Sequence, residues 1–139
     1  MVRGKSVDRL SRPWRVLPLL GMMGLLFYAS SQPGDSFELP ELFEIDKVLH
    51  CLAYAVLAAC VLFAFPDRSS WPGGFSSGLG VVLFCLAYGI SDEFHQLFVP
   101  YRSACVSDLV ADTVGAVFAV LLWRWWRARR RSRRSAAAG

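Results

Sequence analysis

Four long apolar runs, separated by short polar breaks, dominate this chain of 139 residues. They cover approximately residues 14–31, 47–65, 75–98 and 107–126. Each run has close to the ~20 residues that an α-helix needs to cross the hydrocarbon core of a bilayer. The breaks are rich in Pro, Gly and Asp, which end helices and favour turns. The pattern therefore predicts an all-α protein, a bundle of four transmembrane helices.

Composition agrees with this interpretation. Hydrophobic residues make up 55% of the chain and aromatic residues 14%, with a mean hydropathy of +0.40. A soluble domain of this length buries only about two thirds of the surface of its unfolded chain, too little to hide apolar residues in such long runs. Composition therefore excludes an ordinary small soluble domain.

The positive charge lies at the two ends of the chain. Of the 15 Lys and Arg residues, 12 fall within residues 1–15 and 124–134. Cytoplasmic segments of membrane proteins are enriched in these residues, so we predict that both termini are cytoplasmic. The chain then divides into a basic N-terminal segment (1–13), a membrane domain (14–126) and an Arg-rich tail (127–139).

Two consequences of this division concern partners and processing. We expect the tail to contact the anionic lipids of the inner leaflet, and we predict no nucleic-acid partner. An alternative interpretation takes the first apolar run as a cleaved signal peptide, because a basic segment precedes it and small residues end it. That alternative leaves the later loops on the same side of the membrane.

Polar residues interrupt the ends of the last three apolar runs, although a charged group at mid-bilayer costs about 2.5 to 3.5 kcal/mol. The predicted topology places all three of these ends outside. Helical spacing puts Asp46, His50 and Tyr54 on one face of a helix, and Asp108 and Asp112 on one face of another. We therefore predict a polar pocket that opens to the outside. Its residues are Asp46, Lys47, His50, Tyr54, Asp92, Glu93, Gln96, Arg102, Asp108 and Asp112.

Carboxylates outnumber permanent cations in this predicted pocket. Protonation of a carboxylate, a bound cation or exposure to water must therefore remove the excess negative charge. We expect Arg102 to fold back and pair with Asp108 or Glu93, because a free guanidinium beside so many acids is unfavourable. For Asp46 and Asp108 a simpler role stays open, since both begin predicted helices and could cap them.

Motifs for a metal, a cofactor or a nucleophile are missing from the sequence. The four cysteines have no zinc-type spacing, no HExxH is present, and Asp92-x-x-His95 is only a loose pair. No GxSxG elbow exposes a serine. We therefore predict no metal and no cofactor. Cys51 and Cys105 are the two cysteines that the predicted helices could bring together.

The spacing of the polar residues resembles the VanZ-like family of small bacterial integral membrane proteins. The resemblance covers about residues 46–120 and implies a location in the bacterial cytoplasmic (inner) membrane. The family takes its name from a protein associated with resistance to the glycopeptide teicoplanin. The resemblance rests on Asp46-Lys47-x-x-His50-x-x-x-Tyr54, Ser91-Asp92-Glu93-x-x-Gln96-x-Phe98-x-Pro100-x-Arg102 and Ser107-Asp108-x-x-Ala111-Asp112-Thr113-x-Gly115.

The same resemblance implies which residues form the site. Asp112 departs from the family pattern, which more often has Asn at that position, and it adds an acid to the pocket. The residues implied by the resemblance are Asp46, Lys47, His50, Glu93, Gln96, Arg102, Asp108 and, by position, Asp112.

Three functions are compatible with the sequence. The first is a non-enzymatic envelope protein that binds an outer-leaflet lipid head group or a cell-envelope precursor in the pocket. The second is a small membrane enzyme in which Glu93 and His50 perform acid–base chemistry on a lipid-linked substrate. The third is a structural or assembly module whose polar cluster holds the helices together.

Overall fold

The computed structural model describes residues 13–33, 43–65 and 77–137. Within these ranges the chain is entirely helical apart from turns and loops, which confirms the predicted all-α class. A short 3-10 helix, η1 (Pro13–Val16), leads into α1 (Leu17–Ser30). The other helices are α2 (Phe43–Ala64), α3 (Ser77–Gln96) and α4 (Val106–Ala136).

Helix α4 is longer than the predicted fourth run. The apolar pattern ends near Trp126, but the helix continues through the Arg-rich segment to Ala136. Arg and Ala are strong helix formers. Three arginines of this segment also lie over tryptophan rings one turn earlier, with distances to the ring centroids of 4.6, 4.2 and 3.7 Å. These pairs are Arg127 with Trp123, Arg129 with Trp125 and Arg130 with Trp126.

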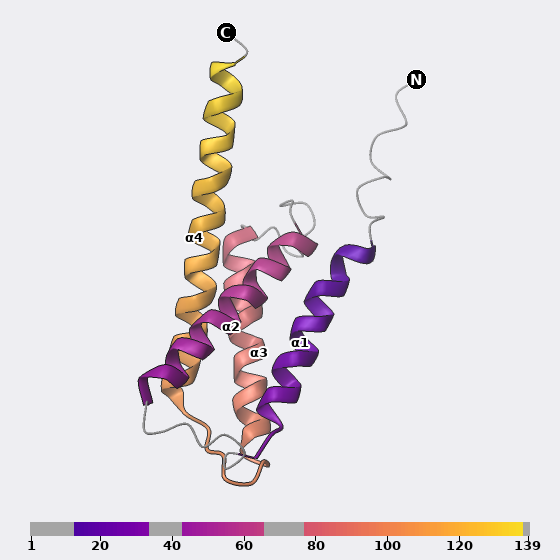
Figure 1. The fold of residues 1–139 in the computed structure, drawn as a ribbon, viewed down its shortest axis with the longest axis vertical. Helices are drawn as coiled ribbons and strands as arrows, with labels where there is room; N and C mark the ends of the chain where they lie inside the picture. Colours follow the sequence, from indigo (N-terminus) through magenta and orange to yellow (C-terminus); the bar gives the residue numbers. More distant parts are fainter. Residues whose placement is uncertain (1–12, 34–42, 66–76, 138–139) are drawn as a thin grey trace.

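The helices form a bundle in which α2 crosses α4 and makes its most extensive contact there (Figure 1). A Cβ atom on Gly115 of α4 would collide with the backbone carbonyl oxygen of Cys51 on α2. A glycine at this position therefore allows the two backbones to approach closely. This crossing lies next to the polar residues of both helices, so it fixes the spacing of the candidate site.

Core residues come from all four helices. Leu57 and Val61 of α2, Cys85 of α3 and Val120 of α4 are buried together with Leu19 of α1. Helix α1 is also fixed by a hydrogen bond, in which the Tyr88 hydroxyl of α3 donates to the Met23 carbonyl at 2.6 Å. All four cysteines are free, so Cys51 and Cys105 are not paired.

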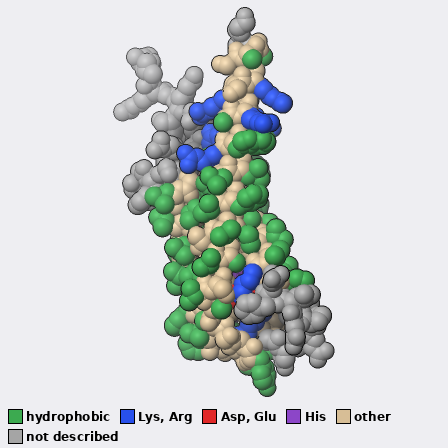
Figure 2. All heavy atoms as spheres, turned by 90° about the vertical axis from the view of Figure 1, so that its left-hand side faces the viewer, with side chains coloured by type: hydrophobic (Ala, Val, Ile, Leu, Met, Phe, Trp, Pro, Cys, Tyr) green, Lys and Arg blue, Asp and Glu red, His purple; other side chains and the backbone are tan. Residues whose placement is uncertain are grey.

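The outer surface of the bundle is apolar. Hydrophobic side chains cover the middle of the face shown in Figure 2, while Lys and Arg gather towards the C-terminal end of α4. Two helices of the described residues are long and apolar enough to cross a membrane, Ile45–Ala64 and Val106–Ala136, and only 28% of the apolar window of each is buried. The core helix of a soluble protein would be mostly buried, so these helices indicate a membrane protein.

Candidate functional site

The polar residues predicted from the sequence lie at one end of the bundle. The start of α2, the end of α3 and the start of α4 meet there, and the Arg-rich end of α4 lies at the opposite end (Figure 1). Lys47, His50 and Arg102 are partly buried, and Asp46 is exposed. Six polar residues of this end are buried in a bundle with an apolar surface: Tyr54, Asp92, Glu93, Gln96, Asp108 and Asp112.

Lys47 joins the first turns of α2 and α4. Its Nζ lies 3.1 Å from Asp46 Oδ2 and also forms an ion pair with Asp108 Oδ1. The side chain of Asp108 is therefore used across the helix interface. The residue before α4, Cys105, makes no side-chain cap, and Asp108 bonds Lys47 instead of acting only as a helix cap.

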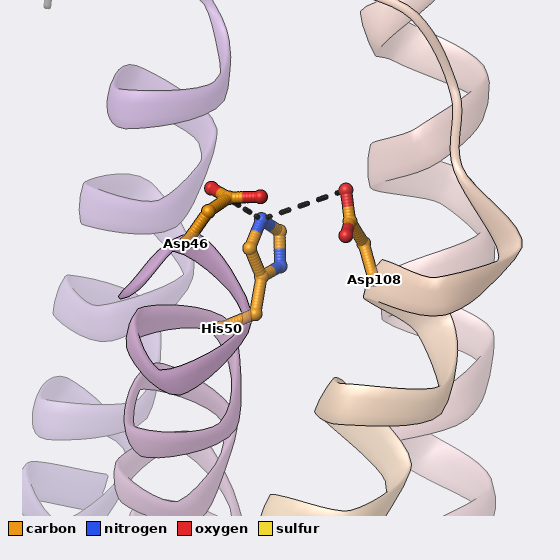
Figure 3. A group of neighbouring side chains, drawn as sticks. All are labelled: Asp46, His50 and Asp108. Atoms are coloured by element: carbon orange, nitrogen blue, oxygen red, sulfur yellow. Dashed lines mark ion pairs between the residues drawn. The ribbon is translucent and has the colours of Figure 1, made fainter. Parts of the chain in front are cut away.

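His50 lies between three carboxylates. Its Nδ1 is at hydrogen-bond distance, 3.0 Å, from Asp112 Oδ1 on α4. On the other side of the ring, Nε2 is 3.9 Å from Asp46 Oδ1 and 4.0 Å from Asp108 Oδ2 (Figure 3). The group that orients the imidazole is therefore Asp112 on the neighbouring helix, although Asp46 is one turn away on the same helix.

Glu93 connects the end of α3 to the start of α4. Its Oε2 accepts a hydrogen bond of 2.6 Å from the backbone N–H of Cys105. This N–H stands at the N-terminus of α4, where helical N–H groups lack partners within the helix. The other oxygen, Oε1, is buried and has no hydrogen-bond partner among the described residues. Glu93 thus carries a free acceptor within electrostatic reach of His50, Asp108 and Asp112.

Arg102 does not form the expected ion pair. Its guanidinium donates from Nη2 to the Ala29 carbonyl and from Nε to the Gln32 carbonyl, both at 3.3 Å. Among the described residues no ion pair joins Arg102 to Asp108 or Glu93, so this prediction is wrong. Asp108 pairs with Lys47 instead. Ala29 lies in the last turn of α1 and Gln32 follows the helix, and carbonyls at a helix C-terminus have no partner in their own helix and attract a cation. Tyr101, with φ of 58°, reverses the chain just before Arg102.

Tyr54, Asp92 and Gln96 lie deeper or to the side. Tyr54 is 1% exposed, and its hydroxyl has no hydrogen-bond partner among the described residues. A Cβ on Gly89 of α3 would lie 3.4 Å from this hydroxyl and 3.1 Å from Asp112 Oδ2, so both groups face the same part of α3. Gln96 is buried at the end of α3, and Asp92 is within electrostatic reach of His50 and Arg102.

The sequence did not predict the contribution of α1 to this end of the bundle. Ser31 Oγ lies 3.0 Å from His95 Nε2, and the ring of Phe27 contacts that of His95 with centroids 4.7 Å apart. His95, which the sequence analysis considered only as a loose pair with Asp92, therefore fixes α1 to α3. The polar residue Ser31, at the end of the first apolar run, was the available signal for this contact.

Comparison with protein families identifies the chain. The model of the VanZ/LLP1 family matches residues 15–127, so the chain belongs to this family. This finding confirms the resemblance seen in the spacing of the polar residues. No curated protein and no solved structure matches the chain.

Proposed function

We propose that this VanZ/LLP1 protein is a four-span protein of the bacterial cytoplasmic membrane that binds an envelope ligand. The binding site is the polar cluster at the ends of α2, α3 and α4, and it faces the extracytoplasmic side. One observation carries the proposal: six polar residues are buried at one end of a bundle whose outer surface is apolar. Because burying polar groups is costly, a cluster of this size needs a function or strong internal pairing.

Helix lengths support four membrane crossings. From Asp108 to Arg124, α4 rises by roughly 24 Å at 1.5 Å per residue, close to the thickness of the hydrocarbon core. Helix α3 has 20 residues, and η1 with α1 spans residues 13–30. Each of these segments is long enough, by the same rise per residue, to cross most of that core.

The distribution of Trp and Arg supports the orientation. Trp14 of η1 contacts Phe63 near the end of α2, with ring centroids 5.6 Å apart. The tryptophans of α4 lie towards the same end of the bundle, next to the arginines that follow them (Figure 1). Tryptophan rings favour the membrane interface, and Arg-rich segments favour the cytoplasm. Both termini would then be cytoplasmic and the polar cluster extracytoplasmic.

Reporter fusions test this orientation. Fusions at Glu38 and at the C-terminus should report opposite sides of the membrane, and a fusion at Ser70 should report the same side as the C-terminus. The fusion at the C-terminus controls for expression, because a cytoplasmic reporter must be active there. A cytoplasmic position for Glu38 would contradict the proposal of an extracytoplasmic site.

The charge of the cluster limits the class of ligand. Five acids lie near two permanent cations, Lys47 and Arg102, and Arg102 is turned towards α1. A ligand that brings positive charge would offset this excess. A lipid head group with a primary ammonium, or the free amino group of an envelope precursor, has the required chemistry.

Thermal unfolding of the full chain in nanodiscs tests ligand binding. Nanodiscs that contain phosphatidylethanolamine should stabilise the protein more than nanodiscs of phosphatidylglycerol alone, because a ligand that binds only the folded state stabilises it. The added stabilisation should be smaller in Asp46→Asn, a change at an exposed carboxylate. His95→Gln, at the other histidine of this end, is the matched control. Equal stabilisation of both variants and the wild type would refute binding at the cluster.

A second candidate function is acid–base catalysis by Glu93 and His50. The observation that favours it is the pairing of His50 with Asp112, which would hold the imidazole so that Nε2 faces the exposed side chain of Asp46. Glu93→Gln keeps the shape and removes the titrating group. In cells that depend on the protein, for example in a teicoplanin-susceptibility assay, full activity of Glu93→Gln would exclude acid chemistry at this residue.

Membrane accumulation separates both candidates from a purely structural role. If His50→Gln accumulates normally but is inactive, the cluster acts on a ligand or substrate. If the variant fails to accumulate, the cluster serves as an assembly element.

The Arg-rich end of α4 is proposed to contact the anionic lipids of the inner leaflet. Each cation near such a surface contributes about 1 kcal/mol, which salt reduces. The purified protein should therefore bind anionic vesicles at low salt and dissociate from them at high salt. Sequence-selective binding of RNA or DNA at physiological salt would contradict this assignment.

A further inference from the structure

Three side chains of the cluster are arranged around a common point. Asp46 and His50 on α2 and Asp108 on α4 each offer one ligand atom, and these atoms lie within 4.8 Å of one another (Figure 3). Tetrahedral zinc sites have metal–ligand bonds of about 2.0 to 2.2 Å, which separates neighbouring ligand atoms by roughly 3.4 Å. The observed distances from His50 Nε2 are 3.9 and 4.0 Å. A contraction of about half an ångström would therefore bring His50 Nε2 to this separation from each of the two carboxylate oxygens.

The orientation of His50 matches that of a metal ligand. Metal-binding histidines almost always donate their second ring N–H to a carboxylate or carbonyl, which fixes the tautomer. Here Nδ1 lies 3.0 Å from Asp112 Oδ1, so a hydrogen on Nδ1 leaves the lone pair on Nε2. That lone pair faces the two carboxylates from which the other ligands would come.

The ammonium group of Lys47 contacts different carboxylate oxygens from those that face His50. It contacts Asp46 Oδ2 and Asp108 Oδ1, whereas His50 Nε2 faces Asp46 Oδ1 and Asp108 Oδ2. Each carboxylate thus has one oxygen for the ammonium and one directed towards the imidazole. A divalent ion together with Lys47 would be balanced by the charges of Asp46, Asp108 and Asp112.

A buried acceptor without a partner gives independent support for a ligand here. Glu93 is 8% exposed, and its Oε1 has no hydrogen-bond partner among the described residues. Its Oε2 is fixed at the N–H of Cys105, three residues before Asp108, so the carboxylate stands beside the first turn of α4. A water bound to a metal ion could donate to Oε1 and satisfy it.

We propose that Asp46, His50 and Asp108 form a binding site for a divalent transition metal ion such as Zn²⁺. Asp112 orients His50, and a position facing Glu93 stays open for water or a ligand oxygen. Because the ion joins α2 to α4, it also fixes the crossing of these helices. The inference goes beyond the proposed function, since metal binding is measured without any envelope ligand.

Zinc titration of the metal-free full chain in detergent, monitored by calorimetry, tests the site. We expect one Zn²⁺ per chain in the wild type and no binding at this stoichiometry in His50→Ala. Asp112→Asn should bind about 10- to 100-fold more weakly, the usual effect of losing a carboxylate that orients a ligating histidine. Lys47→Met should bind more tightly, because it removes a competing cation. His95→Ala, the matched control, should bind like the wild type.

Visible absorption of bound Co²⁺ tests directly whether His50 is a metal ligand and not only a structural residue. Co²⁺ bound by one imidazole and two carboxylates in a low-symmetry site should give visible bands, which must disappear in His50→Gln, a variant of similar size. Circular dichroism before titration shows whether each variant is folded. A folded wild type without stoichiometric zinc binding, or unchanged binding in folded His50→Gln, would overturn the metal site. Either result would leave the nanodisc test of the proposed function unaffected.

Discussion

Substitution of Gly115 by Ala should separate α2 from α4 and weaken the candidate site. The added Cβ would collide with the Cys51 carbonyl oxygen and would lie 2.9 Å from the Cys51 carbonyl carbon and 3.1 Å from the Ala55 nitrogen. All three are backbone atoms, so no side-chain rotation can relieve the contact. Carbon atoms pack at about 3.5 to 4.0 Å, so the two backbones must move apart by roughly 1 Å.

The expected cost follows from this movement. Overpacking of a tight contact costs about 1 to 3 kcal/mol, while Gly to Ala in a helix interior recovers about 0.5 to 1 kcal/mol through helix propensity. We therefore expect Gly115→Ala to lower the free energy of unfolding by about 1 to 2 kcal/mol. A separation of this size would also lengthen the contact between His50 Nδ1 and Asp112 Oδ1 beyond its present 3.0 Å.

Denaturant unfolding in mixed micelles measures the stability change, and imidazole nitrogen chemical shifts report the hydrogen bond of His50. Gly24→Ala on α1 is the matched control, because a Cβ there meets no atom within 4 Å. The control should be neutral or slightly stabilised. If both variants have the same stability and the same His50 shifts, the close crossing of α2 and α4 at Gly115 does not position the site.

Three further predictions, the last with a control variant, concern the packing of α1 and the membrane-facing surface. Tyr88→Phe removes the hydrogen bond to the Met23 carbonyl and should cost about 1 kcal/mol in denaturant unfolding, whereas unchanged stability would argue against this contact. Arg102→Gln removes the bonds to the carbonyls of Ala29 and Gln32 at the C-terminal end of α1, so proteolysis within α1 should become faster, and an unchanged rate would contradict the docking. Val114→Asp places a charge on a half-exposed position of α4, so membrane accumulation should fall, while Ser132→Asp in the Arg-rich end should accumulate normally; equal levels would place Val114 outside the bilayer.

The helices were predictable because each contains a continuous apolar run. The thickness of the bilayer sets the length that such a run is expected to have. The prediction placed the end of α4 at the change from apolar residues to arginines, near Trp126. A helix does not end where hydropathy changes, because its hydrogen bonds are formed by the backbone. Helices end at Gly, at Pro or at capping residues. The Arg-rich segment up to Ala136 contains neither Gly nor Pro.

The membership of the polar cluster was predictable, but its pairing was not. Helical spacing identifies residues on one face, and it places Asp46 one turn from His50 on the same helix. The closer partner is Asp112, which is 62 residues away in the sequence. Which carboxylate reaches His50 depends on how closely α2 and α4 cross, and that distance is set by Gly115. The same argument explains why the proposed metal site is not visible in the sequence, since its ligands come from two helices.

The role of α1 depends on contacts that an apolar run cannot reveal. Its Leu19 lies in the core, its Met23 carbonyl accepts from Tyr88, and the carbonyls of Ala29 in its last turn and of Gln32 just after it accept from Arg102. Removal of this helix, as a cleaved signal peptide would require, would leave the Tyr88 hydroxyl, which packs against the apolar core, without its acceptor, and would remove two acceptors of the Arg102 guanidinium. An unpaired hydroxyl in an apolar environment costs about 1 to 3 kcal/mol. The folded bundle therefore uses α1 as a structural element.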